Sequence, residues 1–270
     1  MIAFDKAELA ARMDQFTSRL APDSQFARFF GKGTAGTDSA RKALRSSGRL
    51  TDLITPCLYR PFDVRYLLYH PAVVDRPRHD ITRNLFQANL SLVTTKYTLE
   101  PFSALASRLV CGQHKINGPY SGSLVFPLYI YPEREQGLTD TMPFDALMSP
   151  WPAGPGGRRP NLSEEFVAAI ASRMSLRFVP DGRGDLIATF GPEDVFHYIY
   201  AVLHSPTYRD RYTEFLKTDF PRIPVTSSKD LFALLAKKGA EIVALHTMES
   251  PLLDEVVATF PITDSNEVTL

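Results

Sequence analysis

The hydrophobic pattern at the start of the chain predicts two helices of different character. Over residues 5–20 the apolar positions fall on one helical face, at Leu9, Met13, Phe16 and Leu20. Asp5 followed by Glu8 has the form of an N-terminal capping box. The next predicted helix, residues 38–49, has few large apolar side chains and is basic, with Arg41, Lys42, Arg45 and Arg49. We therefore expect a connector helix that lies on the surface.

Between about residue 53 and residue 131 the pattern changes to strands. Leu58-Tyr59 and residues 64–69 flank a tight turn at residues 60–63, where Pro61 presets the backbone angle φ. Further β-branched and aromatic runs predict strands at 90–95, 105–110 and 123–130. A short helix is expected at 79–86, with Arg83 exposed.

Helical signals return in the last part of the chain. Asn161 or Ser163 is a candidate cap for a helix that ends near residue 174. Pro192 opens a helix to residue 204, and Pro206 opens another that ends before Asp219. Residues 229–247 form a fourth helical stretch, with Gly239 as a candidate break.

These signals divide the chain into four regions. They are a helical connector at 1–52, a β-rich part at 53–131, a linker or long loop rich in proline and glycine at 132–160, and a mainly helical scaffold at 161–270. The expected fold class is α+β, in which a β-rich half packs on a mainly helical half.

Composition narrows the class of protein. The chain has 270 residues, 44% of them hydrophobic, which is typical of a globular protein. Its two cysteines, Cys57 and Cys111, are too few and too far apart for a disulfide scaffold or a zinc site. We expect a cytoplasmic protein with no membrane span, because no apolar run approaches the length of a spanning helix.

The net charge of zero hides an uneven distribution. Residues 1–120 carry 17 Lys and Arg against 10 Asp and Glu, and residues 121–270 carry 13 against 20. Such asymmetry points to a polyanion-facing surface on the positive half, or simply to more acidic helices in the other half. The first alternative predicts that the positive charge of residues 38–120 lies on one concave face.

Motifs for catalysis are weak or absent. Gly31, Gly33 and Gly36 match a dinucleotide or S-adenosylmethionine fingerprint as a string, but no predicted strand precedes them. His197 and His204 are spaced to share a helix face, without a third ligand nearby. There is no Walker loop and no Asn-Pro-Pro-Tyr motif. We expect a chain that is not an enzyme by itself and holds no cofactor or metal; a small cofactor-dependent enzyme is the weakest alternative.

Polar side chains in predicted turns and loops suggest nucleic-acid binding. Arginine and lysine neutralise phosphates, whereas arginine on guanine and asparagine or glutamine on adenine read bases. Any single one of these residues is more typical of a solvated loop with incidental charge. The candidate DNA-binding residues are Arg76, Arg78, His79, Arg83, Asn84, Lys96, Gln113, His114, Lys115 and Asn117.

Four longer strings carry a family resemblance. They are Cys57-Leu-Tyr-Arg-Pro-Phe-Asp-Val-Arg65, Phe126-Pro-Leu-Tyr-Ile-Tyr-Pro132, the run from Tyr198 to Arg209, and the run from Phe215 to Pro224. In this order and spacing they resemble the C-terminal specificity, or target recognition, region of type ISP restriction–modification enzymes. The resemblance covers about residues 40–250.

The resemblance implies a function that composition does not. Tyr59 to Asp63 would begin a recognition domain, Lys96 would match a basic position of the family, and residues 38–52 would come from the methyltransferase side. The domain would bind duplex DNA sequence-specifically. Adenine-N6 methylation and ATP-dependent cleavage, with their S-adenosylmethionine, ATP and Mg, would belong to methyltransferase and helicase-like domains of the parent polypeptide. The alternative is a protein-interaction module that docks on those domains with little DNA contact.

Overall fold

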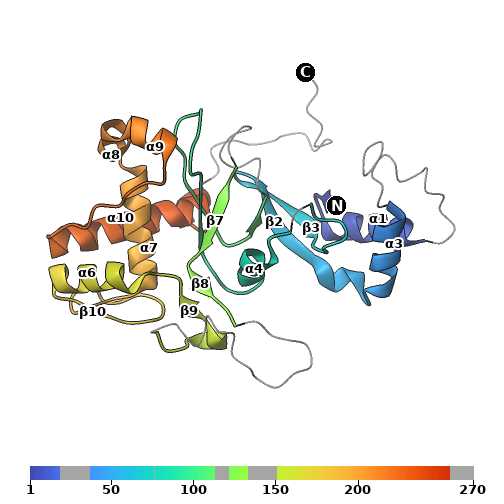
Figure 1. Ribbon diagram of the computed structural model, residues 1–270, viewed down its shortest axis with the longest axis horizontal. Coiled ribbons are helices and arrows are strands. Elements are labelled where there is room, and N and C mark those ends of the chain that lie inside the picture. Colours follow the sequence, from blue (N-terminus) through green and yellow to red (C-terminus); the bar gives the residue numbers. More distant parts are fainter. Residues whose placement is uncertain (19–36, 76, 113–121, 133–150, 256–270) are drawn as a thin grey trace.

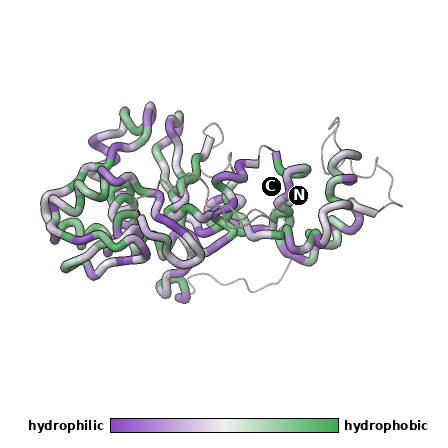
Figure 2. Tube along the Cα trace, turned by 60° about the horizontal axis from the view of Figure 1, so that its bottom comes forward, coloured by the Kyte–Doolittle hydropathy of each residue, from purple (hydrophilic) through white to green (hydrophobic). Residues whose placement is uncertain are grey.

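The protein is elongated, with helices at both ends and strands between them (Figure 1). The computed structural model describes residues 1–18, 37–75, 77–112, 122–132 and 151–255. Helices α1 and α3 lie at one end, a long hairpin and short sheets follow, and α6–α10 form the other end. Apolar stretches occur at both ends of the molecule (Figure 2). The predicted α+β class is confirmed.

The first helix forms as its sequence predicts. Helix α1 (Lys6–Thr17) buries Leu9, Met13 and Phe16. The Asp5 carboxylate accepts a hydrogen bond from the Glu8 backbone N–H at 2.6 Å. Glu8 itself pairs with Arg12, so only half of the expected capping box is present. Strand β1 (Ile2–Ala3) precedes the helix and pairs with β3 (Asp63–Leu68).

Helix α3 (Thr37–Ser46) corrects the prediction of a surface connector. Leu44 is fully buried and Ala40 nearly so, in a cluster that includes Ile54 and Leu68 of the hairpin. Ala40 and Leu44 of this helix therefore pack in one core with the strands that follow. The expected boundary at residues 52 and 53 cuts through that core.

The strand half consists of small sheets. One sheet has the order β1-β3-β2-β6, and the second has the order β5-β4-β7. In the first, β2 and β3 form the predicted antiparallel hairpin, and β6 runs parallel to β2. The turn-and-helix segment between the sheets contains α4 and a 3₁₀ turn. The bounds are β2 (Ile54–Arg60), α4 (His79–Thr82), the 3₁₀ turn Arg83–Leu85, β4 (Ser91–Thr94), β5 (Leu105–Ser107), β6 (Val110–Cys111) and β7 (Leu124–Pro127).

Part of the expected linker is a strand. Strand β9 (Arg159–Pro160) pairs with β8 (Tyr129–Ile130) in an antiparallel register. A short 3₁₀ turn (Pro155–Gly157) leads into β9. Residues 133–150 lie outside the described residues. The segment 151–160 therefore belongs to the folded body, where it joins the strand half to the helical half.

The helical half contains the largest core. Ser163 caps α6, as predicted, by accepting a hydrogen bond from the Phe166 N–H. The expected third helix is divided in two by Tyr212. The elements are α6 (Glu164–Met174), β10 (Arg177–Phe178), β11 (Thr189–Phe190), α7 (Pro192–His204), α8 (Pro206–Arg211), α9 (Thr213–Thr218) and α10 (Lys229–His246).

Gly239 does not break α10. The helix runs unbroken through it, and a Cβ atom there would overlap the carbonyl oxygen of His197 on α7. The glycine therefore lets the backbones of α7 and α10 approach closely where they pack together. Its role is in helix packing rather than in helix termination.

Candidate nucleic-acid interface

Half of the candidate DNA-binding residues lie where the structure describes the chain. Arg76, Gln113, His114, Lys115 and Asn117 fall outside the described residues, as do Gly31, Gly33 and Gly36. The described candidates are Arg78, His79, Arg83, Asn84 and Lys96. Their surroundings separate them into structural and exposed groups.

Asn84 is a structural residue. It has no exposed surface, and its side-chain nitrogen donates hydrogen bonds to the carbonyl oxygens of Asp80, at 2.9 Å, and Ile81, at 3.1 Å. Its side-chain oxygen accepts from the Tyr131 N–H at 2.8 Å. An amide that reads a base must reach solvent, so the structure replaces the predicted DNA contact with a role in fixing the α4 segment.

Arg83 is also tied to the fold. Its Nη1 donates a hydrogen bond to the Tyr131 carbonyl oxygen at 2.8 Å, and the side chain is only half-exposed. The prediction that Arg83 is exposed on the short helix is therefore wrong, because the side chain is half-buried and bonded to the backbone. Together with Asn84, it clamps the α4 segment to the chain just after β8.

Arg78 and His79 are exposed at the start of α4. The His79 ring stacks on Tyr69 with the ring centroids 6.2 Å apart. Arg78 lines a pocket of about 550 Å³ between the hairpin, β6 and the start of β7. Gly112 and Ser123 also line it. Gly112 precedes residues 113–121, which include Gln113 to Asn117, and Ser123 follows them. Arg78 therefore lines the same pocket as the described residues on either side of that segment.

Lys96 does not line this pocket. It lies near the end of the β5-β4-β7 sheet at which β7 begins. It follows β4, whose last residue Thr94 pairs with Leu124, the first residue of β7. Its ammonium nitrogen lies 5.8 Å from the ring centroid of Phe220 in the helical half. The exposed Lys96 therefore lies beside the start of β7.

Three arginines of the positive half have partners within the protein. Arg41 Nε donates to the Phe16 carbonyl oxygen at 2.9 Å, and Arg45 Nε donates to that of Thr17 at 2.7 Å. These bonds satisfy carbonyl groups at the end of α1. Arg108 pairs with Glu249 at 2.7 Å. Arg41 is buried, whereas Arg45 and Arg108 keep exposed side chains. The expectation that the positive charge of residues 38–120 lies on one concave face stays a prediction.

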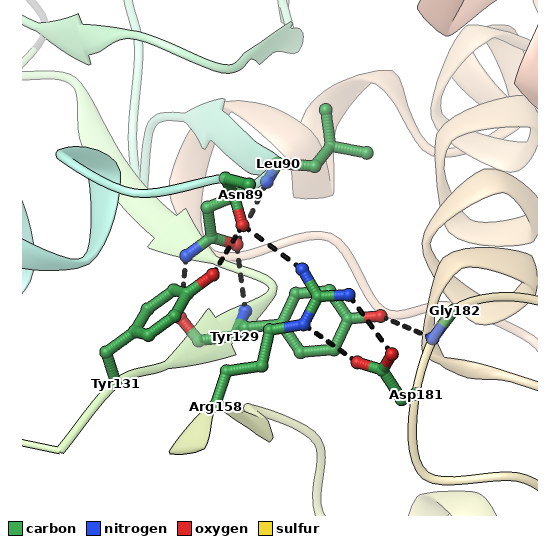
Figure 3. Close-up of polar contacts among 8 residues, drawn as sticks. Asn89, Leu90, Tyr129, Tyr131, Arg158, Asp181 and Gly182 are labelled. Atoms are coloured by element: carbon green, nitrogen blue, oxygen red, sulfur yellow. Dashed lines mark hydrogen bonds and ion pairs between the residues drawn. The ribbon is translucent and has the colours of Figure 1, made fainter. Parts of the chain in front are cut away.

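A polar network holds the strand half against the helical half (Figure 3). Asn89 is buried; it donates to the Tyr129 carbonyl oxygen and accepts from the Tyr129 N–H, at 2.8 and 3.1 Å. The Arg158 guanidinium lies 4.1 Å from the Tyr129 ring centroid and binds both carboxylate oxygens of Asp181. That ion pair raises the pKa of Arg158. Sequence analysis missed this network, because its partners are far apart along the chain and Arg158 falls in the expected linker.

The titratable groups of the described residues can be compared with the requirements of a metal site. No group of three or more His, Cys, Asp or Glu in it is placed to hold a metal ion. Burial lowers the pKa of His197 and of His204 to about 4, so both imidazoles are neutral at physiological pH. No described helix combines the length and apolar character needed to cross a bilayer.

Comparison with known proteins decides the family. The family model of the type ISP C-terminal specificity domain matches residues 1–270. The chain belongs to this family. No curated protein matches this specificity domain.

Solved structures show the same fold. The cryo-EM structure of a DrdV–DNA complex is similar with a TM-score of 0.61 and 24% identity, over 91% of this specificity domain and 22% of that chain. The type ISP restriction–modification enzyme LlaBIII bound to DNA gives 0.58 and 18%, over 90% and 14%. A nuclease-deletion mutant of LlaGI with a DNA substrate mimic gives 0.54 and 17%, over 91% and 17%. The specificity domain thus spans about a fifth or less of these chains.

Proposed function

We propose that this specificity domain binds duplex DNA and recognises its sequence. Family membership carries the proposal, and the DNA complexes formed by the structural neighbours support it. Within the fold, exposed Arg78 lines one pocket together with Gly112 and Ser123. Arginine side chains at such a pocket supply phosphate contacts and base readout.

The chemistry belongs to other parts of a longer polypeptide. In this proposal the domain is not catalytic, and methyltransferase and helicase-like domains carry out adenine-N6 methylation and ATP-dependent cleavage. S-adenosylmethionine, ATP and Mg serve those domains. Duplex DNA and those domains are the partners of this chain, in the cytoplasm.

Salt dependence of binding tests the proposal. A labelled mixed-sequence duplex is titrated with the chain at two salt concentrations. Phosphate contacts release counterions, so affinity falls as salt rises. Absence of binding at low salt, or affinity that does not change with salt, would overturn the DNA-binding function.

An exposed apolar surface favours a second candidate, docking on a protein partner. Tyr97, Leu99 and Phe215 are 66%, 87% and 72% exposed, and the Thr98 N–H binds the Lys217 carbonyl oxygen, which joins their segments. Contiguous apolar surface of this kind is typical of protein interfaces. A domain that docks in this way without contacting DNA would show no binding to the labelled duplex at low salt. The titration therefore distinguishes the two functions.

A further inference from the structure

The tip of the β2–β3 hairpin contains an irregularity that changes which way its side chains face. Leu58 pairs with Val64, but Arg60 rather than Tyr59 pairs with Asp63. One extra residue is thus inserted in β2. A bulge of this kind turns two successive side chains toward one face of a sheet. Tyr59 and Arg60 therefore share a face, where regular alternation would separate them.

Aromatic and guanidinium groups stack on this face. The guanidinium carbon of Arg65 lies 4.1 Å from the ring centroid of Tyr59 and 4.2 Å from that of Phe4. Arg60 also contacts Tyr59, at 5.6 Å. Asp63 binds Arg65 through both carboxylate oxygens, which raises the pKa of Arg65. The charge of Arg65 is therefore paired with that of Asp63, whereas Arg60 is exposed.

The face that carries the stack continues into the Arg78 pocket. Tyr59 and Cys57 both line that pocket, and Cys57 pairs with Arg65 across the hairpin. The core with α1 uses the other face, through Ile54 and Leu68. The stack and the pocket thus form one surface on the side of the hairpin away from α1.

The hairpin tip is held in place at its far end. Phe62 has a φ of 65°, a left-handed conformation that is unfavourable for a residue with a side chain. Its ring is edge-on to His246 at the end of α10, with the centroids 5.9 Å apart, and Tyr200 hydrogen-bonds to His246 at 2.6 Å. This contact docks the tip on the helical half. Arg60 is therefore presented by a fixed turn rather than by a loose loop.

We propose that Arg60, turned by the bulge onto the Tyr59–Arg65 face, contacts a DNA phosphate beside the Arg78 pocket. The proposal rests on the DNA-binding function and adds to it a residue that is not among the candidate DNA-binding residues of the sequence analysis. A guanidinium matches a phosphate in charge and in fork geometry, and stacking on an aromatic ring pre-orients it.

Substitution of Arg60 tests the proposal in the full chain. Arg60→Ala is compared with Arg177→Ala, which removes an exposed arginine from β10 in the helical half. Affinity for a labelled mixed-sequence duplex is measured over a range of salt, and thermal unfolding verifies that each variant folds. Arg60→Ala weakens binding several-fold at low salt and lowers the slope of log affinity against log salt by about 0.9, the value for one phosphate. Arg60→Lys restores the slope, and Arg177→Ala leaves both quantities unchanged.

Two results would count against the inference, and they differ in what they overturn. If the wild-type chain binds DNA with a normal salt dependence and Arg60→Ala behaves like Arg177→Ala, the phosphate contact is wrong and the DNA-binding function stands. If the wild-type chain does not bind DNA, both proposals fail.

Discussion

The helical half and the strand half use their polar side chains in different ways. In the helical half Asp194 is fully buried and accepts hydrogen bonds from the N–H groups of Gly184 and Gly191, at 2.6 and 2.9 Å. In the strand half Arg60 and Arg78 are exposed beside an open pocket. A group whose partners lie within the fold stabilises it, whereas an exposed cation on a fixed element is available to a ligand. The comparison favours the hypothesis that the helical half is a scaffold and that the strand half, apart from buried Asn84 and Asn89, carries recognition.

The close packing of α7 on α10 gives the largest expected effect. Gly239→Ala forces a Cβ atom against the His197 carbonyl oxygen, which is backbone and cannot rotate away. We expect a loss of about 3 kcal/mol or more in the free energy of unfolding, measured by urea titration. Gly112→Ala is the matched control in the strand half, because a Cβ atom there meets nothing within 4 Å. Equal effects of the two substitutions would contradict the proposed scaffold.

Polar packing inside the strand half is next. Asn89→Ala removes the partners of the buried Tyr129 N–H and carbonyl groups, so we expect a loss of about 2–3 kcal/mol in the free energy of unfolding. Gln87→Ala, at an exposed position nearby, is the control. A stability change no larger than that of the control would show that the Asn89 side chain of Figure 3 does not hold β8 in the strand half.

Acid should destabilise the helical half. His197 and His204 have pKa values of about 4 in the folded protein against 6.5 for the free side chain, because burial disfavours the charged form. Arg183, Asp194 and Arg108 face His197, and Arg209 and His246 face His204. The unfolded chain binds more protons between these values, so stability is complete above pH 6.5 and falls toward pH 4. We expect a loss of about 1.5 kcal/mol between pH 6.5 and 5, after allowance for solvent screening.

Urea titrations at these two pH values measure that loss. His204→Gln should reduce the dependence on pH, because it removes one of the two neutral histidines. Stability that stays constant or rises as the pH falls would contradict the burial of these side chains.

Two predicted base-reading residues separate stability from binding most finely. Asn84→Ala should lower the free energy of unfolding by about 2 kcal/mol, since it deletes buried hydrogen bonds, and should weaken DNA binding by the folded protein less than Arg78→Ala does. Arg78→Ala should change stability by less than about 0.5 kcal/mol and weaken DNA binding. The reverse pattern would exchange the roles that the structure gives them.

Local sequence signals predicted the helices and strands well, but they did not predict the contacts between segments that are distant along the chain. The caps at Asp5 and Ser163, the hairpin around Pro61 and the helix opened by Pro192 depend on neighbouring residues, which a sequence shows directly. The burial of α3 depends on a core shared with distant strands, so its basic composition was misleading.

The candidate site stays a prediction, and the structure changes which residues belong to it. The basic and amide residues in turns pointed to nucleic acid, and Arg78 remains an exposed candidate. Asn84 looked the same in sequence, yet its partner Tyr131 is distant along the chain. Sequence analysis missed Arg60 for a different reason. The alternation of side chains along a strand does not predict a bulge, because a bulge depends on the register of β2 with β3.

Crosslinking from position 78 tests the central claim most directly. Burial raises the pKa of both native thiols, Cys57 and Cys111, to about 11, so they react slowly at neutral pH and an introduced cysteine can be labelled selectively. Arg78→Cys and Arg177→Cys are each modified with a photo-crosslinker and irradiated with a labelled duplex. We predict that DNA is captured from position 78 and not from position 177. Capture from position 177 alone would place DNA on the helical half and contradict the division between recognition and scaffold.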